Sequence, residues 1–264
     1  MKSARVDYDA IADSYDSTPY RTKLVDPELL AFIGQRVSSD ELVALDIGCG
    51  TGNQLIANCA ALISAQLIGV DRSSGMLKQA RRKAPNIAWV QADAAAPPFQ
   101  AESFDFVTCQ FAFHHIQDKS ENLCDAFRVL KPRGSFIMKN VCPHDCSDWL
   151  FYIYFPEALT IDLHDFWSPE EITTEMDKAG FDAVAVDRDH LRVQQDLRAW
   201  LKEVRQRRTC SQLLAIPDAA YEAGLRRLTQ ELADQSSPVI RENHLCLVTI
   251  RGEKRRDGRK CCGA

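Results

Sequence analysis

A glycine-rich loop is the first group of residues whose types and spacing indicate chemistry. It reads Asp46-Ile47-Gly48-Cys49-Gly50-Thr51-Gly52-Asn53, and its glycines allow a sharp turn and the close approach of a ligand. Dinucleotide sites use G-x-G-x-x-G, whereas here the third glycine comes one residue early, and the chain has no G-K-[ST] phosphate loop. A carboxylate at Asp46 would repel phosphate and attract an ammonium group. The loop is therefore a poor match for a pyrophosphate.

Further polar residues follow the ends of predicted strands. Asp71 ends the run QLIGVD, Asp93 follows IAWVQ, and Gln110, His114 and His115 follow FDFVTC. Ligands of doubly wound sheets bind outside the carboxyl ends of the strands, so we expect these side chains near the glycine loop. Histidine suits proton abstraction near pH 7. His115 is the candidate catalytic base, with a structural role for the histidine pair as the alternative, and Gln110 is the candidate positioning group.

The cysteines do not have the spacing of a metal site. Four of the ten lie inside apolar runs, which is typical of small buried residues: Cys59, Cys109, Cys124 and Cys246. Cys142 and Cys146 flank His144 in CPHDC, but this spacing is wider than that of a zinc knuckle and no second half follows. The sequence therefore predicts no metal centre.

An aromatic segment at residues 149–167 holds seven of the 22 aromatic residues. Trp149, Tyr152 and Phe155 are three residues apart and would share one helix face. One hypothesis is an apolar lid over a substrate, with His164 as a polar group of the same pocket. The alternative is a helix packed into the core.

The elements that must position these residues alternate along the chain. Strands are predicted at residues 42–47, 66–70, 87–91, 104–109 and 134–140, and helices at 26–37, 52–63, 74–84 and 119–130. Asp26 is the candidate N-cap of the first helix, and KPRG is expected to end the fourth. This alternation is typical of βαβ units in a parallel, doubly wound sheet. Two further strands are predicted at 181–187 and 245–250, with helices near 195–208 and 218–234 between them.

Length and charge exclude several classes of protein. The 264 residues fit one domain. A formal net charge of −5 lacks the basic character of a dedicated nucleic-acid binder. No stretch approaches the ~18 uninterrupted apolar residues of a membrane span, and acids occupy the start of the chain where a signal peptide needs an apolar run. We therefore expect a cytoplasmic protein without nucleic-acid or membrane partners.

The motif LDIGCGTGN resembles motif I of the class I S-adenosylmethionine-dependent methyltransferases. The other motifs of that family follow in order, as GVD, SSGML, ADA, FDFVTCQFAFHHI and FRVLKPRGSFIM. Upstream, YDAIADSYD resembles the N-terminal lid of the type-11 members, which include the methyltransferases of ubiquinone and menaquinone biosynthesis. The resemblance covers about residues 8–140. It implies an α/β fold with a Rossmann-like, doubly wound sheet of seven strands, the last strand antiparallel, and a helical insertion between the last two strands.

The resemblance also implies roles for individual residues. Asp71 would hold the ribose hydroxyls, Met76 would pack on the adenine, and Asp93 would bind the adenine amino group. Residues of the N-terminal segment would close over the methionine end. The predicted S-adenosylmethionine site comprises Tyr15, Tyr20, Arg21, Asp46, Gly48, Cys49, Gly50, Gly52, Asp71, Arg72, Met76, Asp93, Ala94 and Gln110.

We expect one methyltransferase domain over residues 1–250 and a disordered tail over 251–264. The domain would comprise lid helices at 1–36, a cofactor-binding core at 42–140, an aromatic substrate-side segment at 141–180 and a helical insertion at 190–243. A monomer or a homodimer is expected.

Sulfonium is an activated methyl donor, so the protein mainly has to align the reactants and exclude water. The predicted function is methyl transfer to an oxygen, nitrogen or carbon atom of a partly apolar small molecule. One alternative is methylation of a metalloid such as arsenite held by thiolates, because the chain ends with the pair Cys261-Cys262. The other is a non-catalytic S-adenosylmethionine-binding module that regulates a partner.

Overall fold

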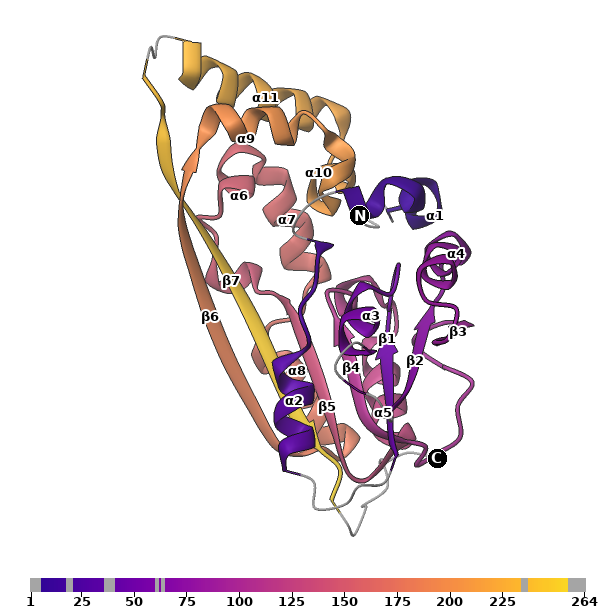
Figure 1. Ribbon diagram of the computed structural model, residues 1–264. Helices are drawn as coiled ribbons and strands as arrows, with labels where there is room; N and C mark the ends of the chain where they lie inside the picture. The colour runs from indigo at the N-terminus through magenta and orange to yellow at the C-terminus, as the bar shows by residue number, and fades with distance from the viewer. Residues whose placement is uncertain are drawn as a thin grey trace. The chain divides into compact units, whose positions relative to one another are not determined.

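The computed structural model describes residues 6–17, 21–35, 41–59, 62, 65–233 and 237–255 (Figure 1). The chain forms two compact units. The first, called here the glycine-loop unit, comprises Tyr8–Asn140, Pro169–Asp187 and Thr249–Ala264. The second, called the helical unit, comprises Met1–Asp7, Val141–Ser168 and Arg188–Val248. The expected single domain over 1–250 stays a prediction.

Seven strands form one sheet in the order β3-β2-β1-β4-β5-β7-β6. Their bounds are β1 Leu42–Ile47, β2 Ala65–Asp71, β3 Ala88–Gln91, β4 Phe104–Gln110, β5 Leu130–Val141, β6 Asp182–Asp196 and β7 Ile240–Glu253. The pairs β1–β2, β1–β4, β2–β3 and β4–β5 are parallel. The amides of Arg133 and Cys142 donate to the carbonyls of Lys254 and Cys246, respectively. Because these partner numbers run in opposite directions, β7 is antiparallel to β5, and the predicted fold class is confirmed.

The two central strands of the glycine-loop unit, β1 and β4, are buried along almost their whole length, as expected where both faces of a parallel sheet are covered. In β4, Phe104–Cys109 are all buried, and Ile47, Val70 and Val107 have no exposed surface. The helices of this unit are α1 Tyr8–Ile11, α2 Pro27–Gly34, α3 Asn53–Cys59, α4 Ser74–Lys83, α5 Lys119–Val129 and α8 Pro169–Ala179, together with the 3-10 helices η1 Ala12–Ser17 and η3 Phe113–His115. As predicted, Asp26 caps α2, where its side chain accepts from the amide of Glu28.

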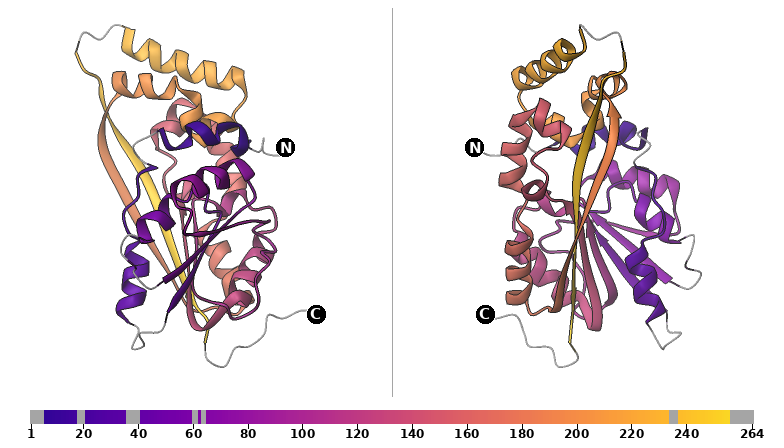
Figure 2. Two further views of the ribbon diagram at one scale, coloured as in Figure 1. Left: turned by 45° about the vertical axis from the view of Figure 1, so that its right-hand side comes forward. Right: turned by 90° about the vertical axis from the view of Figure 1, so that its left-hand side faces the viewer.

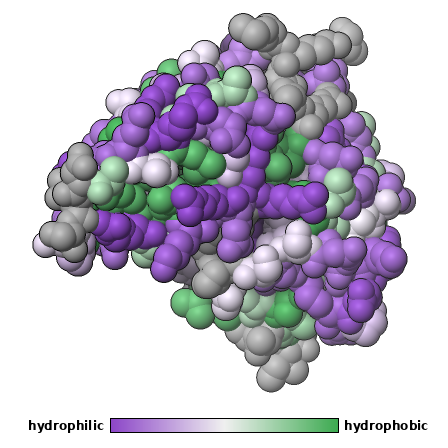
Figure 3. Space-filling model, turned by 90° about the horizontal axis from the view of Figure 1, so that it is seen from above, coloured by the Kyte–Doolittle hydropathy of each residue, from purple (hydrophilic) through white to green (hydrophobic). Residues whose placement is uncertain are grey.

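The helical unit contains the predicted insertion between β6 and β7. Its helices are α6 Leu150–Tyr154, α7 Pro156–Asp165, α9 Leu197–Val204, α10 Ser211–Ala215 and α11 Asp218–Ala233, with the 3-10 helices η4 Pro143–Asp145 and η5 Arg207–Thr209. Helices α9 and α11 lie side by side (Figure 2). Helix α11 buries Tyr221, Gly224, Leu228 and Leu232, which are three or four residues apart. The face of the molecule seen in Figure 3 is mostly hydrophilic, with hydrophobic side chains between the polar ones.

Three strands are longer than the sequence patterns predict. The segment KPRG was expected to end a helix, but β5 already begins at Leu130, and Arg133 takes a positive φ of 68° while its amide pairs with β7. Strand β6 continues as far as Asp196, and β7 already begins at Ile240. Together the two strands form a long two-stranded ribbon (Figure 2). Most of β6 is exposed and polar, so it lacks the apolar alternation by which strands are recognised.

The boundary of the C-terminal tail also differs from the expectation. Residues 251–253 belong to β7, and Lys254 is 6% exposed. The Arg251 guanidinium binds the carboxylate of Glu28, and the Lys254 ammonium donates to the carbonyl of Phe127 at 3.2 Å. Residues 256–264, including Cys261 and Cys262, lie outside the described residues. Within the described part of the chain, no helix has the length and apolar character needed to cross a bilayer.

Candidate functional site

The glycine loop connects β1 to α3 and is fixed to β2. The amide of Gly48 donates to the carbonyl of Val70 at 2.8 Å. Gly48 and Gly52 have φ values of 71° and 79°, which L side chains rarely adopt. A Cβ atom would lie 2.3 Å from Ala112 Cβ at Gly48 and 2.3 Å from the Trp89 ring at Gly52. Packing therefore requires glycine at both positions.

Asp71 ends β2 beside the glycine loop. Its Oδ2 accepts from the Gly50 amide at 2.8 Å, and its Oδ1 accepts from the Ser73 amide at 2.8 Å. Burial raises the pKa of Asp71, although these hydrogen bonds oppose the shift. The structure thus brings together the loop and the acid that the sequence analysis assigned to one ligand.

Asp46 is 4% exposed at the end of β1. Its Oδ1 accepts from Thr108 Oγ1 at 2.9 Å. Burial raises the pKa of Asp46 to about 7, the charges of Asp26 and Asp71 add to the shift, and the Thr108 hydrogen bond and the Lys23 charge oppose it. A cationic ligand next to Asp46 would favour its ionised form.

Lys23 is a residue that the sequence analysis missed. Its ammonium lies 4.8 Å from the centre of the Phe111 ring, just after β4. Partial burial lowers the pKa of Lys23, the neighbouring Arg21 lowers it further, and Asp46 opposes the shift. No motif marks Lys23, because it lies in the irregular segment before α2.

Gln110, at the end of β4, is held by a buried carboxylate. Gln110 Nε2 donates to Asp26 Oδ2 at 2.6 Å, and Lys139 Nζ pairs with Asp26 Oδ1 at 2.7 Å. The Asp26 amide in turn donates to Asn58 Oδ1 at 2.9 Å. This network fixes the orientation of the Gln110 amide. Asp26 was predicted only as a helix cap, and its second role depends on tertiary contacts.

The two histidines after β4 have different environments. His115 Nε2 lies 2.6 Å from the hydroxyl of Tyr8, in the first turn of α1. His114 Nδ1 lies 3.2 Å from Asn140 Nδ2, and burial together with the charges of His115 and Lys119 lowers the pKa of His114 well below its ordinary value. His114 is therefore neutral near pH 7. His115 is thus hydrogen-bonded to Tyr8, a residue that was not singled out from the sequence.

Two acidic residues of the N-terminal segment bind the glycine loop and the start of α4. Asp9 Oδ1 accepts from Ser73 Oγ at 2.7 Å and from the Gly75 amide at 2.6 Å, at the start of α4. Asp16 Oδ1 accepts from Thr51 Oγ1 at 2.7 Å. Neither acid was predicted from the sequence, because their partners Ser73 and Thr51 lie 64 and 35 positions further along the chain. Their contacts fit the expected lid, which stays a prediction.

Two of the predicted lid residues are described. The Arg21 guanidinium donates to the Tyr15 hydroxyl at 2.6 Å and lies 4.0 Å from the centre of its ring. Tyr20 lies outside the described residues. The part of the Tyr15–Arg21 pair in cofactor binding stays a prediction.

The residues expected around the adenine lie on two adjoining segments. Met76 is 2% exposed in the first turn of α4, whereas Arg72 and Asp93 are exposed. Asp93 Oδ1 accepts from the Ala95 amide at 3.0 Å. The Ala94 carbonyl accepts from Nδ2 of the fully buried Asn122 at 2.6 Å. Asn122, on α5, supports this loop and was not foreseen.

The aromatic residues predicted to line a substrate pocket are buried in the helical unit. Trp149 and Tyr152 pack edge to face with ring centres 5.1 Å apart, and Phe155 stacks on Tyr221 at 6.1 Å. A Cβ atom at Gly224 would lie 2.2 Å from the Phe155 ring. Their role toward a substrate stays a prediction.

His164 is separate from this aromatic core. Its side chain is 70% exposed, and its Nδ1 pairs with Asp165 at 2.9 Å. The buried polar group among these helices is instead Asp162, which the sequence analysis missed. It accepts from the hydroxyl of Tyr152 at 2.8 Å and from Gln212 Nε2 at 3.1 Å.

Comparisons with known proteins agree with the geometry of the glycine-loop unit. The model of a family described as "Methyltransferase domain" matches residues 45–138. The demethylmenaquinone methyltransferase of Chlorobaculum tepidum is 30% identical over 165 residues, which cover 60% of this chain and 68% of that protein. A homologue with the same name from Chlorobaculum parvum is 35% identical, but the match spans 44% of this chain and only 48% of that protein.

Solved structures agree at the level of the fold. A methyltransferase of an antibiotic biosynthesis pathway from Anabaena variabilis has a TM-score of 0.66 at 19% identity, over 87% of this chain and 98% of that one. A phosphoethanolamine N-methyltransferase from Haemonchus contortus, solved with S-adenosyl-L-methionine, has a TM-score of 0.58 at 19% identity, over 96% of this chain and 61% of that one. The loop geometry, the family match and the Chlorobaculum tepidum relative establish that this chain belongs to the class I S-adenosylmethionine-dependent methyltransferases.

Proposed function

We propose that this protein methylates a partly apolar small molecule whose acceptor atom loses a proton during the reaction. The observation that carries this proposal is the 2.6 Å contact between the Tyr8 hydroxyl and His115 Nε2. His115 ends η3, the short 3-10 helix that follows β4 at the carboxyl end of the sheet, where ligands of this fold bind. A reaction without proton removal needs no such pair.

The described residues fit S-adenosylmethionine. Asp46 and Asp71 are carboxyl groups whose pKa values burial raises, so a cationic ligand stabilises their charged forms. The glycine loop offers backbone close to both. We assign Asp71 to the ribose hydroxyls, Asp46 to the methionine ammonium and Met76 to the adenine.

The bound cofactor supplies an activated methyl group to an in-line nucleophile. Gln110, held by Asp26, orients the acceptor. As the acceptor attacks, its proton passes to the Tyr8 oxygen, and the Tyr8 proton passes to His115 Nε2. His115 releases that proton to solvent after turnover. A positioned general base of this kind contributes about 10²–10⁴-fold to the rate.

The acceptor class is proposed from the relatives. The two proteins from Chlorobaculum are named demethylmenaquinone methyltransferases. A protein of Campylobacter jejuni is named a C-methyltransferase of ubiquinone and menaquinone biosynthesis. It is 28% identical over 56% of this chain and 75% of its own length. We therefore propose a hydroxylated aromatic ring as the acceptor, methylated at carbon. Loss of a ring or hydroxyl proton is the step that the Tyr8–His115 pair serves.

The proposal is tested by measuring S-adenosylhomocysteine formation with reduced quinones that lack one ring methyl group, with simple amines for comparison. Tyr8→Phe and His115→Asn should each lower kcat about 10²-fold or more and leave the KM for S-adenosylmethionine within about twofold.

Ser14→Ala is the matched control, since it removes a hydroxyl that donates to the Ile11 carbonyl in the same segment and leaves the Tyr8–His115 pair intact. A Tyr8→Phe enzyme with the kcat of the unmodified protein would refute the role of the pair. If no acceptor yields S-adenosylhomocysteine while the cofactor still binds, the chain is a regulatory binding module.

A further inference from the structure

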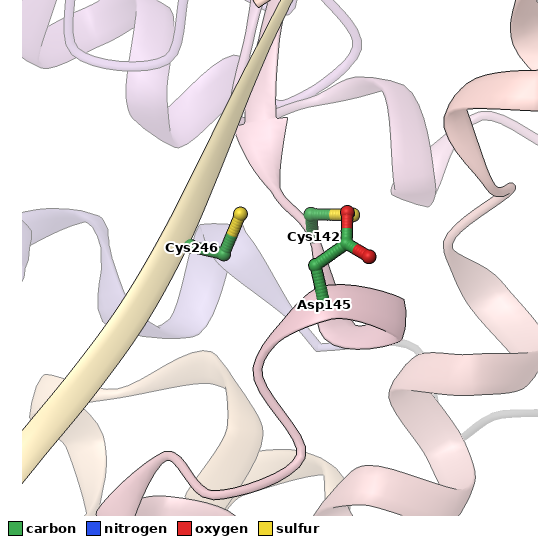
Figure 4. Close-up of side chains that lie close together, drawn as sticks. All are labelled: Cys142, Asp145 and Cys246. Carbon is green, nitrogen blue, oxygen red and sulfur yellow. The ribbon is translucent and has the colours of Figure 1, made fainter. Parts of the chain in front are cut away.

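Two thiols and a carboxylate that play no part in the proposed reaction meet in the helical unit. Cys142 follows β5, Asp145 ends η4 and Cys246 lies in β7 (Figure 4). The two sulfurs and one oxygen all lie within 4.8 Å of one another. The Cys142 amide donates to the Cys246 carbonyl at 2.9 Å, so backbone pairing places the two thiols side by side.

We propose that Cys142, Cys246 and Asp145 bind a thiophilic divalent cation of the zinc type. Thiolates and carboxylates are protein ligands of zinc, and a water molecule can complete four-coordination. The site is independent of methyl transfer, because all of its ligands come from the helical unit. The segment CPHDC alone does not predict a metal site, because no second pair of ligands follows it nearby in the sequence. In the folded chain a further thiol comes from Cys246, 104 residues after Cys142.

The charges at this site balance. Two thiolates and the Asp145 carboxylate carry three negative charges, and the Arg188 Nε, 2.8 Å from Asp145 Oδ2, contributes one positive charge. A dication brings the sum to zero. On binding, each thiol loses its proton to solvent and forms a sulfur–metal bond, so two protons are released for each cation.

The geometry requires little movement. A tetrahedral zinc site with Zn–S bonds of about 2.3 Å places its two sulfurs about 3.8 Å apart. The two sulfurs therefore have to approach each other by about 1 Å at most, starting from the observed limit of 4.8 Å. The Cys142 thiol already donates to Asp145 Oδ2 at 3.2 Å.

A path to the site leads past Asp145. Cys142 and Cys246 are 2% and 0% exposed, whereas the Asp145 side chain is 33% exposed. The carboxylate can therefore meet a hydrated cation first and the thiols complete its coordination.

Cys146 provides a matched control in the same segment. It is 1% exposed, but its thiol donates to the Cys142 carbonyl at 3.1 Å and is not one of the three ligands. A serine at this position removes a buried thiol close to the site and keeps the three ligands. General loss of a cysteine and loss of a ligand are thereby distinguished.

The test is titration of the reduced, chelator-treated full chain with Co²⁺ and then with Zn²⁺ as competitor, by near-ultraviolet absorption and melting temperature. We expect one cation per chain, a sulfur-to-cobalt absorption band and a higher melting temperature with Zn²⁺. Loss of an outer partner lowers metal affinity about 10–100-fold, so Cys142→Ser and Cys246→Ser should each lower it about 100-fold or more. Asp145→Asn, at a partly exposed position, should weaken binding without a change of fold, and Cys146→Ser should bind within about twofold.

The same titrations on a Cys261→Ser, Cys262→Ser background remove the C-terminal thiol pair from the measurement. Absence of stoichiometric binding by the unmodified chain would overturn the proposal, as would retained affinity in the Cys142→Ser protein. Formation of a Cys142–Cys246 disulfide in air, with no metal uptake by the reduced chain, would also overturn it. None of these outcomes depends on methyl transfer, so failure of this site leaves the proposed reaction untouched.

Discussion

The glycine-loop unit and the helical unit both bury carboxyl groups, but they supply them with different partners. In the glycine-loop unit, Asp71 accepts from two backbone amides of adjoining loops. In the helical unit, Asp162 accepts from the side chains of Tyr152 and Gln212. Burial raises the pKa of Asp162 to about 6, although both hydrogen bonds oppose the shift.

The difference shows that a raised pKa alone does not mark a functional acid. Asp162 lies among aromatic rings and is bonded to partners of the same helical core, which is a structural arrangement. Asp46 and Asp71 lie at the carboxyl ends of parallel strands, next to a loop whose three glycines take positive φ values. Position in the sheet, together with the shift, distinguishes the two kinds of site.

The largest effect is expected from Asp71→Ala. If Asp71 holds the ribose, this change removes two charge-assisted hydrogen bonds of about 1.5–3 kcal/mol each, and cofactor affinity should fall tenfold or more. Tyr152→Phe is the counterpart in the helical unit. It should lower the free energy of unfolding by about 1–3 kcal/mol, because Asp162 loses a partner, and leave cofactor affinity within about twofold.

Calorimetric titration with S-adenosylmethionine and thermal or urea unfolding check this pair of variants. Unchanged cofactor binding by Asp71→Ala would contradict the assignment of Asp71, and tight binding of NAD would contradict the assignment of the whole site. Equal loss of cofactor affinity in both variants would contradict the distinction between a ligand-binding Asp71 and a structural Asp162.

A pH effect of intermediate size is expected from Asp46. Its pKa of about 7 in the folded chain exceeds the ordinary 3.8, so the folded chain keeps a proton that the unfolded chain loses. The stability contributed by this group is therefore complete below about pH 4 and is lost as the pH rises through 7. Cofactor affinity should change in the opposite direction and increase about tenfold from pH 6 to 8, because the ammonium requires the ionised acid.

Asp46→Asn should flatten both pH profiles. Melting temperatures of the unliganded proteins and calorimetric affinities, measured between pH 5 and 8, test this. A cofactor affinity of the unmodified protein that does not change with pH would show that Asp46 does not meet the ammonium.

The smallest effect is expected at the C-terminus. Removal of residues 256–264 should leave cofactor affinity and methyl transfer within about twofold, or roughly 0.4 kcal/mol. Truncation after Gly252 should instead destabilise the protein, because it removes Lys254, whose ammonium lies 4.9 Å from the Phe127 ring centre. Unfolding curves and arsenite-dependent formation of S-adenosylhomocysteine, measured on both truncations and the full chain, test the two statements. A tenfold loss of arsenite turnover on removal of residues 256–264 would favour metalloid methylation.

Much of the cofactor-binding half could be predicted because its signals are local. The segment 42–47 is β1 as predicted, and Asp26 caps α2 as predicted, since apolar runs and capping residues act within a few positions. Strand β6 was predicted to end at 187 but extends to Asp196. Its exposed polar residues are held by pairing with β7 and not by an apolar face, so sequence periodicity does not reveal them.

By itself, the sequence determined the class of fold, the glycine loop and the acids that follow the strands. These features depend on spacing within a motif or on alternation along the chain. Only the tertiary structure decided which side chains meet. Tyr8 contacts His115 across 107 positions, and Cys142 reaches Cys246 because β7 pairs antiparallel with the end of β5. The order and register of the strands fix such contacts. No local pattern in the sequence specifies the strand order or the register.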